Sequence, residues 1–354
     1  MKKNYLISTG GSGGHVIPAL IFHQHLSGDA NIIISSDKRG LKYLNKDIYN
    51  LEIVNTPKLS SFILLPINLL LILILTFKSI FLLKNKKIEK LISTGGYMSL
   101  PLIFAAKLLQ INIYLIEPNQ ILGRANKFFL SSCEKIFCYN KKIKNFPNKF
   151  MNKIIVINPL VKKEVYEKVS STISKDKFNL LIVGGSQGAN IFNNNLKNSI
   201  INISKKIKIK VFQQTNEKNI LYLNDFYKRN NIENKIFDFE RNFENIVKEA
   251  DLCITRAGAS TLAELSVLNI PFIAVPLPTA KDNHQFENAK FYKDHDCCWI
   301  IEQNYFEEKI EEFLKDIIEK KSDYLKKIEN LKKLNYQNTW INVNQKITKN
   351  INEN

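Results

Sequence analysis

Cysteine is scarce in this 354-residue sequence, and its spacing matches no metal site. The five cysteines are Cys133, Cys138, Cys253, Cys297 and Cys298. An odd number argues against a disulfide framework, and adjacent cysteines rarely pair. The first apolar run, in "KKNYLIS", is too short for the core of a secretory signal. We therefore expect reduced thiols and a location on the cytoplasmic side.

Acidic residues are the minority among the charged ones. The chain has 51 Lys and Arg against 33 Asp and Glu, a formal charge of +18. Such a surplus attracts polyanions, whether nucleic acid, anionic lipid or a phosphorylated substrate. Lys, Asn and Ile are abundant along the whole chain, so a biased coding composition explains the charge about equally well.

The order of apolar segments predicts an α/β protein. Short apolar runs such as "NYLIS" and "NIIISS" alternate with helical segments, a pattern typical of parallel sheets covered by helices on both faces. After a Lys/Ser-rich stretch at 162–177 the pattern restarts at Phe178 with "FNLLIVGGSQGAN". The length and this restart predict two domains, 1–160 and 161–334, and the helical stretch 335–354 is a candidate to pack back on the first.

One long hydrophobic run, residues 62–83, interrupts the alternation. It is long enough to span a membrane, but Lys78 interrupts it and Pro66 and Asn68 weaken its start. The next strand must also rejoin the same sheet. We favour a helix that dips into the membrane interface, with the following "KNKKIEK" meeting anionic head groups. A buried core helix and a true span are the alternatives.

Glycine-rich turns follow three of the expected strands: "GGSGG", "TGGYMSLP" and "GGSQGAN". Backbone amides in such turns approach phosphates closely, and a following helix adds its dipole. The turns lack the Lys-Ser/Thr pair of a phosphate-binding ATPase loop and the GxGxxG spacing of a dinucleotide site. They nevertheless lie at the carboxyl ends of strands, where open α/β sheets bind ligands.

A fourth turn, in "ITRAGASTLAEL", adds charged side chains. Arg256 is placed to clamp a phosphate, and the helix that starts near Gly258 would point its first amides at a diphosphate. Glu264 is placed to accept hydrogen bonds from both hydroxyls of a ribose. A capping-box role with Ser260 or Thr261 is an equal alternative for this glutamate.

Taken together, these motifs resemble the MurG family of bacterial peptidoglycan glycosyltransferases. The match is collinear from about residue 4 to residue 303, through "GGSGGHVIPAL", "TGGYMSLP", "EPNQILGRANKFF", "GGSQGAN", "ADLCITRAGASTLAEL" and "PLPTAKDNHQFENA". The resemblance implies the GT-B fold, in which two Rossmann-like, doubly wound domains face a cleft. It also implies an inverting transfer of N-acetylglucosamine from UDP-N-acetylglucosamine to the 4-hydroxyl of the N-acetylmuramic acid unit of lipid I, forming lipid II.

The resemblance assigns roles to individual residues. Ser186 would lie near the donor phosphates, Glu264 on the uridine ribose, and Gln285 and Asn288 on the sugar hydroxyls. The full donor-binding set that it implies is Ser12, Gly13, Gly14, Asn119, Ser186, Glu240, Arg256, Gly258, Ala259, Ser260, Thr261, Leu262, Ala263, Glu264, His284, Gln285 and Asn288, with Lys162 as a further phosphate ligand.

Three departures from the family pattern affect this set. The family's His-Glu-Gln-Asn is here Ile116-Glu117-Pro118-Asn119, and its paired glutamines are His284 and Gln285. The arginine of its Gly-Asn-Pro-Val-Arg is replaced by Val161, and Lys162 or Lys163 would have to substitute. Lysine does not reproduce the bidentate contact of arginine with phosphate.

The chemistry needs a base for the acceptor hydroxyl and charge stabilisation for departing UDP. His15 is the expected general base, since it stands where a loop becomes a helix, and the positive end of a helix disfavours a second proton on the ring. A structural or acceptor-positioning role is the alternative. Amide turns and Arg256 suit the leaving group without a metal, and no cofactor or DxD-type ligand pair is expected.

The expected partners are UDP-N-acetylglucosamine, lipid I and anionic lipids on the cytoplasmic face of the plasma (inner) membrane, where the protein would be peripheral. Other cell-wall enzymes are further candidates, and nucleic acid is not expected. Two rival functions remain. One is a diacylglycerol glycosyltransferase or another sugar-nucleotide enzyme of the same fold, which "TGGYMSLP" disfavours. The other is a nucleotide-sugar binding protein without turnover, which the presence of His15 and Glu264 disfavours.

Overall fold

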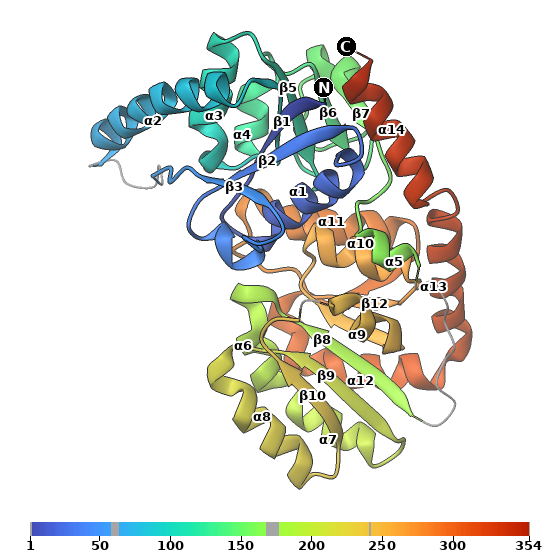
Figure 1. The fold of residues 1–354 in the computed structure, drawn as a ribbon. Coiled ribbons are helices and arrows are strands. Elements are labelled where there is room, and N and C mark those ends of the chain that lie inside the picture. Colours follow the sequence, from blue (N-terminus) through green and yellow to red (C-terminus); the bar gives the residue numbers. More distant parts are fainter. Residues whose placement is uncertain (1, 58–63, 168–176, 241, 354) are drawn as a thin grey trace. The chain divides into compact units, whose positions relative to one another are not determined.

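The computed structural model describes residues 2–57, 64–167, 177–240 and 242–353. The chain divides into two compact units (Figure 1). Unit 1 comprises Met1–Lys163 and Thr339–Asn354, and unit 2 comprises Glu164–Asn338. The changes of unit at 163/164 and 338/339 lie a few residues beyond the boundaries expected at 160 and 334.

Unit 1 is built on a parallel sheet that has seven strands among the described residues, in the order β3-β2-β1-β4-β5-β6-β7. The strands are β1 (Lys3–Ser8), β2 (Ala30–Ser36), β3 (Asn50–Ile53), β4 (Ile88–Ser93), β5 (Asn112–Glu117), β6 (Lys135–Cys138) and β7 (Ile154–Val156). The central strands are continuous apolar runs because both faces of the sheet are covered.

Helices cover both faces of this sheet (Figure 1). They are α1 (Gly13–Leu26), α2 (Leu65–Asn85), α3 (Leu100–Leu108), α4 (Arg124–Phe129) and α14 (Trp340–Asn352), with 3₁₀ turns η1 (Gly40–Tyr43), η2 (Tyr97–Ser99) and η3 (Asn148–Lys153). One core cluster joins the sheet to α3 through Leu102 and Ile103. The other joins it to α1 and α14 through Phe22 and Ile347. The C-terminal helix therefore packs in unit 1.

Unit 2 repeats the architecture with a parallel sheet that has six strands in the described part of the chain, in the order β10-β9-β8-β11-β12-β13. The strands are β8 (Phe178–Val183), β9 (Ile209–Gln214), β10 (Glu233–Phe237), β11 (Leu252–Thr255), β12 (Phe272–Ala274) and β13 (Cys298–Ile300). The helices are α5 (Lys163–Tyr166), α6 (Gly185–Asn195), α7 (Lys197–Ser204), α8 (Glu217–Arg229), α9 (Phe243–Glu249), α10 (Ala259–Val267), α11 (His284–Asp294), α12 (Phe306–Glu319) and α13 (Lys321–Leu334), with 3₁₀ turns η4 (Lys281–Asn283) and η5 (Gln303–Tyr305).

Each sheet is wound outward from its first strand in two directions. In unit 1 the order reverses between β1 and β4, and in unit 2 between β8 and β11. Loops at such a switch point diverge to opposite faces of the sheet and leave a crevice that binds ligands. The predicted class, two doubly wound Rossmann-like domains, is confirmed. The topology also identifies the four loops on which binding residues should stand.

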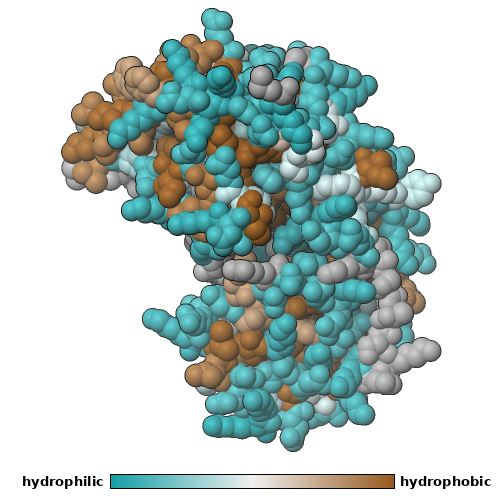
Figure 2. Space-filling model, viewed as in Figure 1, coloured by the Kyte–Doolittle hydropathy of each residue, from teal (hydrophilic) through white to brown (hydrophobic). Residues whose placement is uncertain are grey.

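The helix α2 presents its apolar side to solvent and its polar side to the protein. Its buried positions recur every three or four residues, which places them on one face: Asn68, Ile72, Thr76, Ser79 and Leu83. Most of that face is polar or small. The exposed apolar side chains are Ile67, Leu69, Leu70, Leu71, Leu73, Ile74, Phe77 and Phe81, and Figure 2 shows hydrophobic side chains gathered over α2.

This burial pattern excludes one alternative for the hydrophobic run. Only 17% of the most apolar stretch of α2 is buried, so α2 is not a core helix. Within the described residues it is the one helix with the length and hydropathy to cross a membrane. Positions 62 and 63 of the predicted segment lie outside the described residues.

Candidate functional site

At the switch point of unit 1, hydrogen bonds from Thr94 connect the glycine loop after β4 to the glycine loop after β1. Thr94, directly after β4, donates its amide to Ser8 O at 3.1 Å, and its hydroxyl donates to Thr9 Oγ1 at 2.9 Å. The loop after β4 turns through Gly95 and Gly96, whose φ angles of 79° and 81° favour glycine. The loops after β1 and β4 are thereby held side by side.

His15 stands on the first turn of α1 and bonds to the other loop. Its Nδ1 lies 2.8 Å from the carbonyl oxygen of Thr94. A carbonyl oxygen only accepts, so Nδ1 carries the proton and the neutral ring keeps its lone pair on Nε2. Gly96 lies close to this nitrogen: a methyl group there would lie 3.4 Å from Nε2 and would overlap the Met98 side chain, which packs against the glycine. The ring is thus fixed in the tautomer that a base needs.

The predicted contacts of the first loop surround the start of α1. Ser12 is the N-cap residue, and its side chain makes no capping bond. Gly13 and Gly14 open the helix, where the first amides have no carbonyl of a preceding turn to bind. These amides remain suited to an anionic ligand, as the sequence predicted for this turn.

Asp37, directly after β2, borders the candidate site and was not among the residues predicted from the sequence. It is buried, and its Oδ1 accepts the amides of Gly11 at 2.8 Å and Gly40 at 3.0 Å. Burial alone would raise the pKa of Asp37, but these amides and the Arg39 guanidinium outweigh it, so the pKa is below its usual range. An acidic residue directly after "NIIISS" was the available signal, since it follows the strand next to β1.

Asn119 is held by its neighbour Glu117 at the end of β5. The Glu117 carboxylate is buried and accepts Asn119 Nδ2 at 3.0 Å, Gly123 N at 2.7 Å and Asn126 Nδ2 at 3.0 Å. Glu117 therefore orients the predicted site residue and closes the loop behind it. Ile116, where the family has histidine, is fully buried in the core, so that departure changes the packing behind the loop.

The remaining unit 1 position follows β7. Val161, in the place of the family's arginine, is fully buried, and Lys162 beside it is half-buried. A buried valine presents nothing to a phosphate. Lys162 as a phosphate ligand stays a prediction.

In unit 2 the first loop of the switch point begins at Gly184 and runs into α6. The amide of Gly185, at a φ of 63°, donates to Gln214 Oε1 at 3.0 Å, and Gln214 Nε2 donates to Asp238 O at 3.0 Å. Ser186 lies in the first turn of α6, and its side chain is outside the described part of the structure. Glu240, farther along, accepts Lys235 Nζ at 3.2 Å.

Arg256 follows β11, but its guanidinium is directed into the protein. Nη1 donates to Val275 O at 2.9 Å, and Nη2 donates to Gln303 Oε1 at 2.6 Å. Burial lowers the pKa of Arg256 to about 10. In this arrangement the arginine ties β11 to the segment after β12. A direct phosphate contact would have to replace these bonds, and the clamp role stays a prediction.

The second loop of the unit 2 switch point leads into α10, whose N-cap is Gly258. Ala259, Ser260 and Thr261 supply its first amides, while Leu262 and Ala263 are buried and pack the helix. The capping-box alternative for Glu264 is wrong, because neither Ser260 nor Thr261 is the N-cap residue. The ribose contact predicted for Glu264 remains.

Residues of α11 support this loop from the side. Asn288 is buried and donates to Ala257 O at 3.1 Å. Gln285 Oε1 accepts the amide of Leu277 at 2.8 Å, and His284 Nδ1 lies 2.8 Å from Lys281 O. The structure thus brings the predicted residues around Arg256, Gly258 and Asn288 together on unit 2. Those around His15 and Asn119 lie on unit 1.

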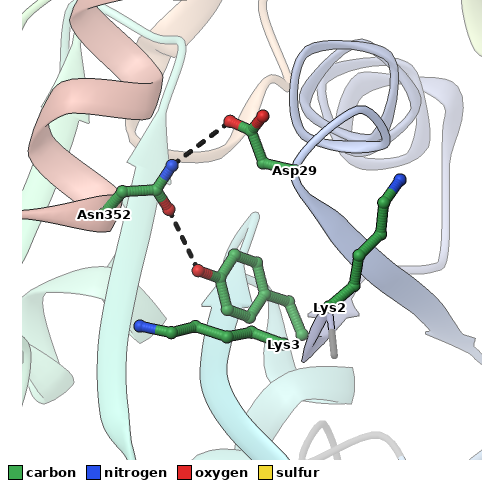
Figure 3. Close-up of a pocket in the computed structure, with 5 residues that line it drawn as sticks. Lys2, Lys3, Asp29 and Asn352 are labelled. Atoms are coloured by element: carbon green, nitrogen blue, oxygen red, sulfur yellow. Dashed lines mark hydrogen bonds between the residues drawn. The ribbon is translucent and has the colours of Figure 1, made fainter.

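A cavity of about 550 Å³ lies at the other end of β1 (Figure 3). Its lining includes Lys2, Lys3 and Tyr5, and Asn352 bridges Tyr5 Oη at 3.0 Å and Asp29 Oδ2 at 3.2 Å. The amino end of the strand is remote from His15, so this cavity is not part of the candidate site. Among the described residues, no group of three or more His, Cys, Asp or Glu is arranged to hold a metal ion.

Two family models match the chain. Residues 5–138 match the glycosyltransferase family 28 N-terminal domain, and residues 179–339 match the glycosyltransferase family 28 C-terminal domain. The two matches fall on unit 1 and unit 2 respectively.

Curated relatives match over most of their length. A protein of Pelagibacter ubique named UDP-N-acetylglucosamine–N-acetylmuramyl-(pentapeptide) pyrophosphoryl-undecaprenol N-acetylglucosamine transferase is 51% identical over 356 residues, covering 100% of both chains. A protein of the same name from Rickettsia canadensis is 38% identical and covers 86% of this chain and 87% of its own.

Solved structures share the fold. The crystal structure of Acinetobacter baumannii MurG aligns with a TM-score of 0.74 at 23% identity and covers 100% of both chains. A UDP-GlcNAc 2-epimerase from Neisseria meningitidis, bound to UDP-GlcNAc, aligns with a TM-score of 0.68 at 13% identity. At these identities the likeness concerns the fold alone.

Proposed function

Because this chain belongs to the MurG family of glycosyltransferases, we propose that it transfers N-acetylglucosamine from UDP-N-acetylglucosamine to the 4-hydroxyl of the N-acetylmuramic acid unit of lipid I. The product is lipid II, an intermediate of peptidoglycan synthesis. The observation that carries the mechanism is the bond between His15 Nδ1 and Thr94 O at 2.8 Å, which leaves Nε2 as the proton acceptor.

The transfer is a single displacement. The acceptor 4-oxygen attacks the anomeric carbon, its proton passes to His15 Nε2, and the bond from that carbon to the UDP oxygen breaks. Attack from the face opposite the leaving group inverts the anomeric centre. A base fixed by Thr94 loses no freedom at this step, because its orientation is set before the acceptor arrives.

The leaving UDP gains negative charge, which unit 2 is suited to stabilise. The first amides of α10 follow β11 at the switch point and offer donors together with the positive end of that helix, and α6, after β8, adds the positive end of a second helix. The ribose contact of Glu264 would fix the nucleoside. This mechanism does not require a metal ion, because backbone donors stabilise the negative charge on the leaving UDP.

The acceptor carries a long lipid, so we propose that the protein works peripherally on the cytoplasmic face of the plasma membrane. The outward leucines of α2 support this, because moving apolar side chains from water into the membrane interface lowers the free energy. Lys84 lies in the last turn of the helix, Lys86 and Lys87 follow it, and these lysines would meet anionic head groups. The polar stripe that includes Asn68 and Thr76 packs inward, so α2 keeps its place on unit 1 as it docks.

One assay tests the proposed reaction against both rivals. Purified protein is mixed with UDP-N-acetylglucosamine and a short-chain lipid I analogue, and release of UDP is followed over time. Release that depends on this acceptor supports the proposal. Equal release with diacylglycerol in its place, or donor binding without any release, would overturn it in favour of a lipid glycosyltransferase or a non-catalytic binding protein.

A further inference from the structure

A guanidinium lies beside the glycine loop that follows β1, and the protein holds one of its edges. Arg39 donates from Nε and Nη2 to Asp37 Oδ2, at 2.8 and 2.5 Å. The other oxygen of Asp37 accepts the amides of Gly11 and Gly40. One buried carboxylate therefore fixes both the loop and the arginine, so a ligand would not have to order the side chain.

Tyr97 supports the same guanidinium from the loop after β4. The Arg39 Cζ atom lies 5.2 Å from the centroid of the Tyr97 ring, within the range of a cation–π contact. The Arg39 side chain nevertheless remains 42% exposed, whereas that of Asp37 is 6% exposed. Arg39 is thus a positioned cation that solvent, or a ligand, still reaches.

The guanidinium and the imidazole of His15 border the same small surface. A methyl group on Gly11 would lie 2.8 Å from Met98 Cε and 3.5 Å from Arg39 Nη2. A methyl group on Gly96 would lie 2.9 Å from the same Met98 atom and 3.4 Å from His15 Nε2. The two glycines make room for the buried Met98 side chain, with the cation near Gly11 and the base near Gly96.

We propose that Arg39 binds the diphosphate of the lipid acceptor and determines acceptor affinity, an inference that rests on the proposed function. An acceptor whose hydroxyl reaches His15 Nε2 presents its other groups to the surface around that ring. A guanidinium fork binds paired phosphate oxygens, and the amides that open α1 add donors suited to the same anion. The fixed carboxylate of Asp37 holds Arg39 in place for this contact.

The test replaces Arg39 and compares the effect on the KM for the acceptor with the effect on the KM for the donor. Arg39→Gln removes the charge, Arg39→Lys keeps it without the fork, and Lys38→Gln removes the neighbouring exposed charge as a matched control. We expect Arg39→Gln to raise the KM for a short-chain lipid I analogue about 10–100-fold, the range for losing a charged hydrogen bond. Arg39→Lys should show part of this loss. The control, the KM for UDP-N-acetylglucosamine and direct UDP binding should not change.

Several outcomes would overturn the assignment. They are an unchanged acceptor KM, an equal rise in the Lys38→Gln control, or an equal rise in the donor KM, which would assign the arginine to UDP. The carboxylates of the stem peptide share the chemistry of the diphosphate, so the series is repeated with an acceptor that lacks the peptide. A penalty that persists there supports the diphosphate, and one that disappears assigns Arg39 to the peptide instead.

Folding and the proposed function are controlled separately. Thermal unfolding is measured for each variant, and Arg39→Lys carries the test where Arg39→Gln fails to fold. Failure of the proposed function would appear in the unchanged protein as no UDP release with lipid I analogue. Failure of the Arg39 assignment would appear as normal turnover by the variants.

Discussion

The imidazole of His25 stacks on the indole of Trp340, with ring centroids 3.6 Å apart and planes inclined by 15°. The contact joins α1 to α14, and Asn344 adds a hydrogen bond to His25 O at 3.0 Å. The segment that returns to unit 1 at the end of the chain therefore packs against the helix that carries His15.

This stack predicts a pH dependence of stability. Burial lowers the pKa of His25 from 6.5 to about 3, so the unfolded chain binds a proton that the folded chain does not between these values. Stability should therefore fall as the pH drops below 6.5, by about 2 kcal/mol at pH 5 from this group. His25→Phe keeps an aromatic ring against Trp340 and removes the titration. Chemical unfolding at pH 8 and pH 5 should show a smaller acid loss in this variant, and an equal loss would contradict the prediction.

The base role predicts a selective kinetic effect of His15→Ala. Loss of a general base lowers kcat by about 10²–10⁴-fold, while donor binding on unit 2 should be untouched. His23→Gln, eight residues along the same helix, is the control because it removes an imidazole that does not bond to Thr94. Steady-state kinetics with UDP binding measured in parallel decide the matter. An equal loss of donor affinity would rule out the base role.

The outward face of α2 predicts binding to lipid. Leu69, Leu70 and Leu73 are each more than half exposed. Full burial of one leucine side chain in an apolar phase stabilises the bound state by about 1.5–3 kcal/mol. Replacing all three with serine should lower partitioning onto anionic liposomes at least about tenfold, even with partial insertion. UDP binding should persist. Leu221→Ser, at a leucine that is 77% exposed on unit 2, is the control, and unchanged partitioning of the triple variant would refute the membrane role of α2.

How α2 packs illustrates where sequence reasoning ends. The length and composition of residues 62–83 allowed an interface helix, a core helix or a span. Its apolar residues occupy most of the circumference, so the sequence does not reveal which side packs. The structure decides this through the inward stripe that includes Ile72 and Thr76, because the neighbouring helix α3 lies on that side.

In the loops too, the sequence predicts what depends on neighbouring residues and does not predict contacts between segments far apart in the chain. The positions of His15 and Gly258 follow from strand-glycine-helix patterns within about twenty residues, and these were predicted. Asp37 meets Gly11 only because β2 pairs with β1, and Arg256 meets Gln303 only because the chain returns after β13. The motif predicts a phosphate contact for Arg256, but it does not contain Val275 or Gln303, whose oxygens accept hydrogen bonds from the guanidinium in the structure.

Glu117 offers a test of how Asn119 is positioned. Its carboxylate accepts hydrogen bonds from Asn119, Gly123 and Asn126, all at 3.0 Å or less for the closest atoms. In Glu117→Gln one acceptor oxygen becomes an NH₂ group, which sets donor against donor in a buried place. Such an unsatisfied pair costs about 1–3 kcal/mol of folding stability. The loss of Asn119 orientation should lower turnover as well.

The control for this variant is Glu89→Gln, an exposed glutamate on β4. Thermal unfolding and turnover are measured for both variants, with UDP binding as a check that unit 2 is intact. If Glu117 only stabilises the loop, then turnover at a temperature well below the unfolding midpoint should equal that of the unchanged protein. If it also positions Asn119, turnover falls there while UDP binding is kept. We expect the second result, because two of the bonds to this carboxylate come from Asn119 itself.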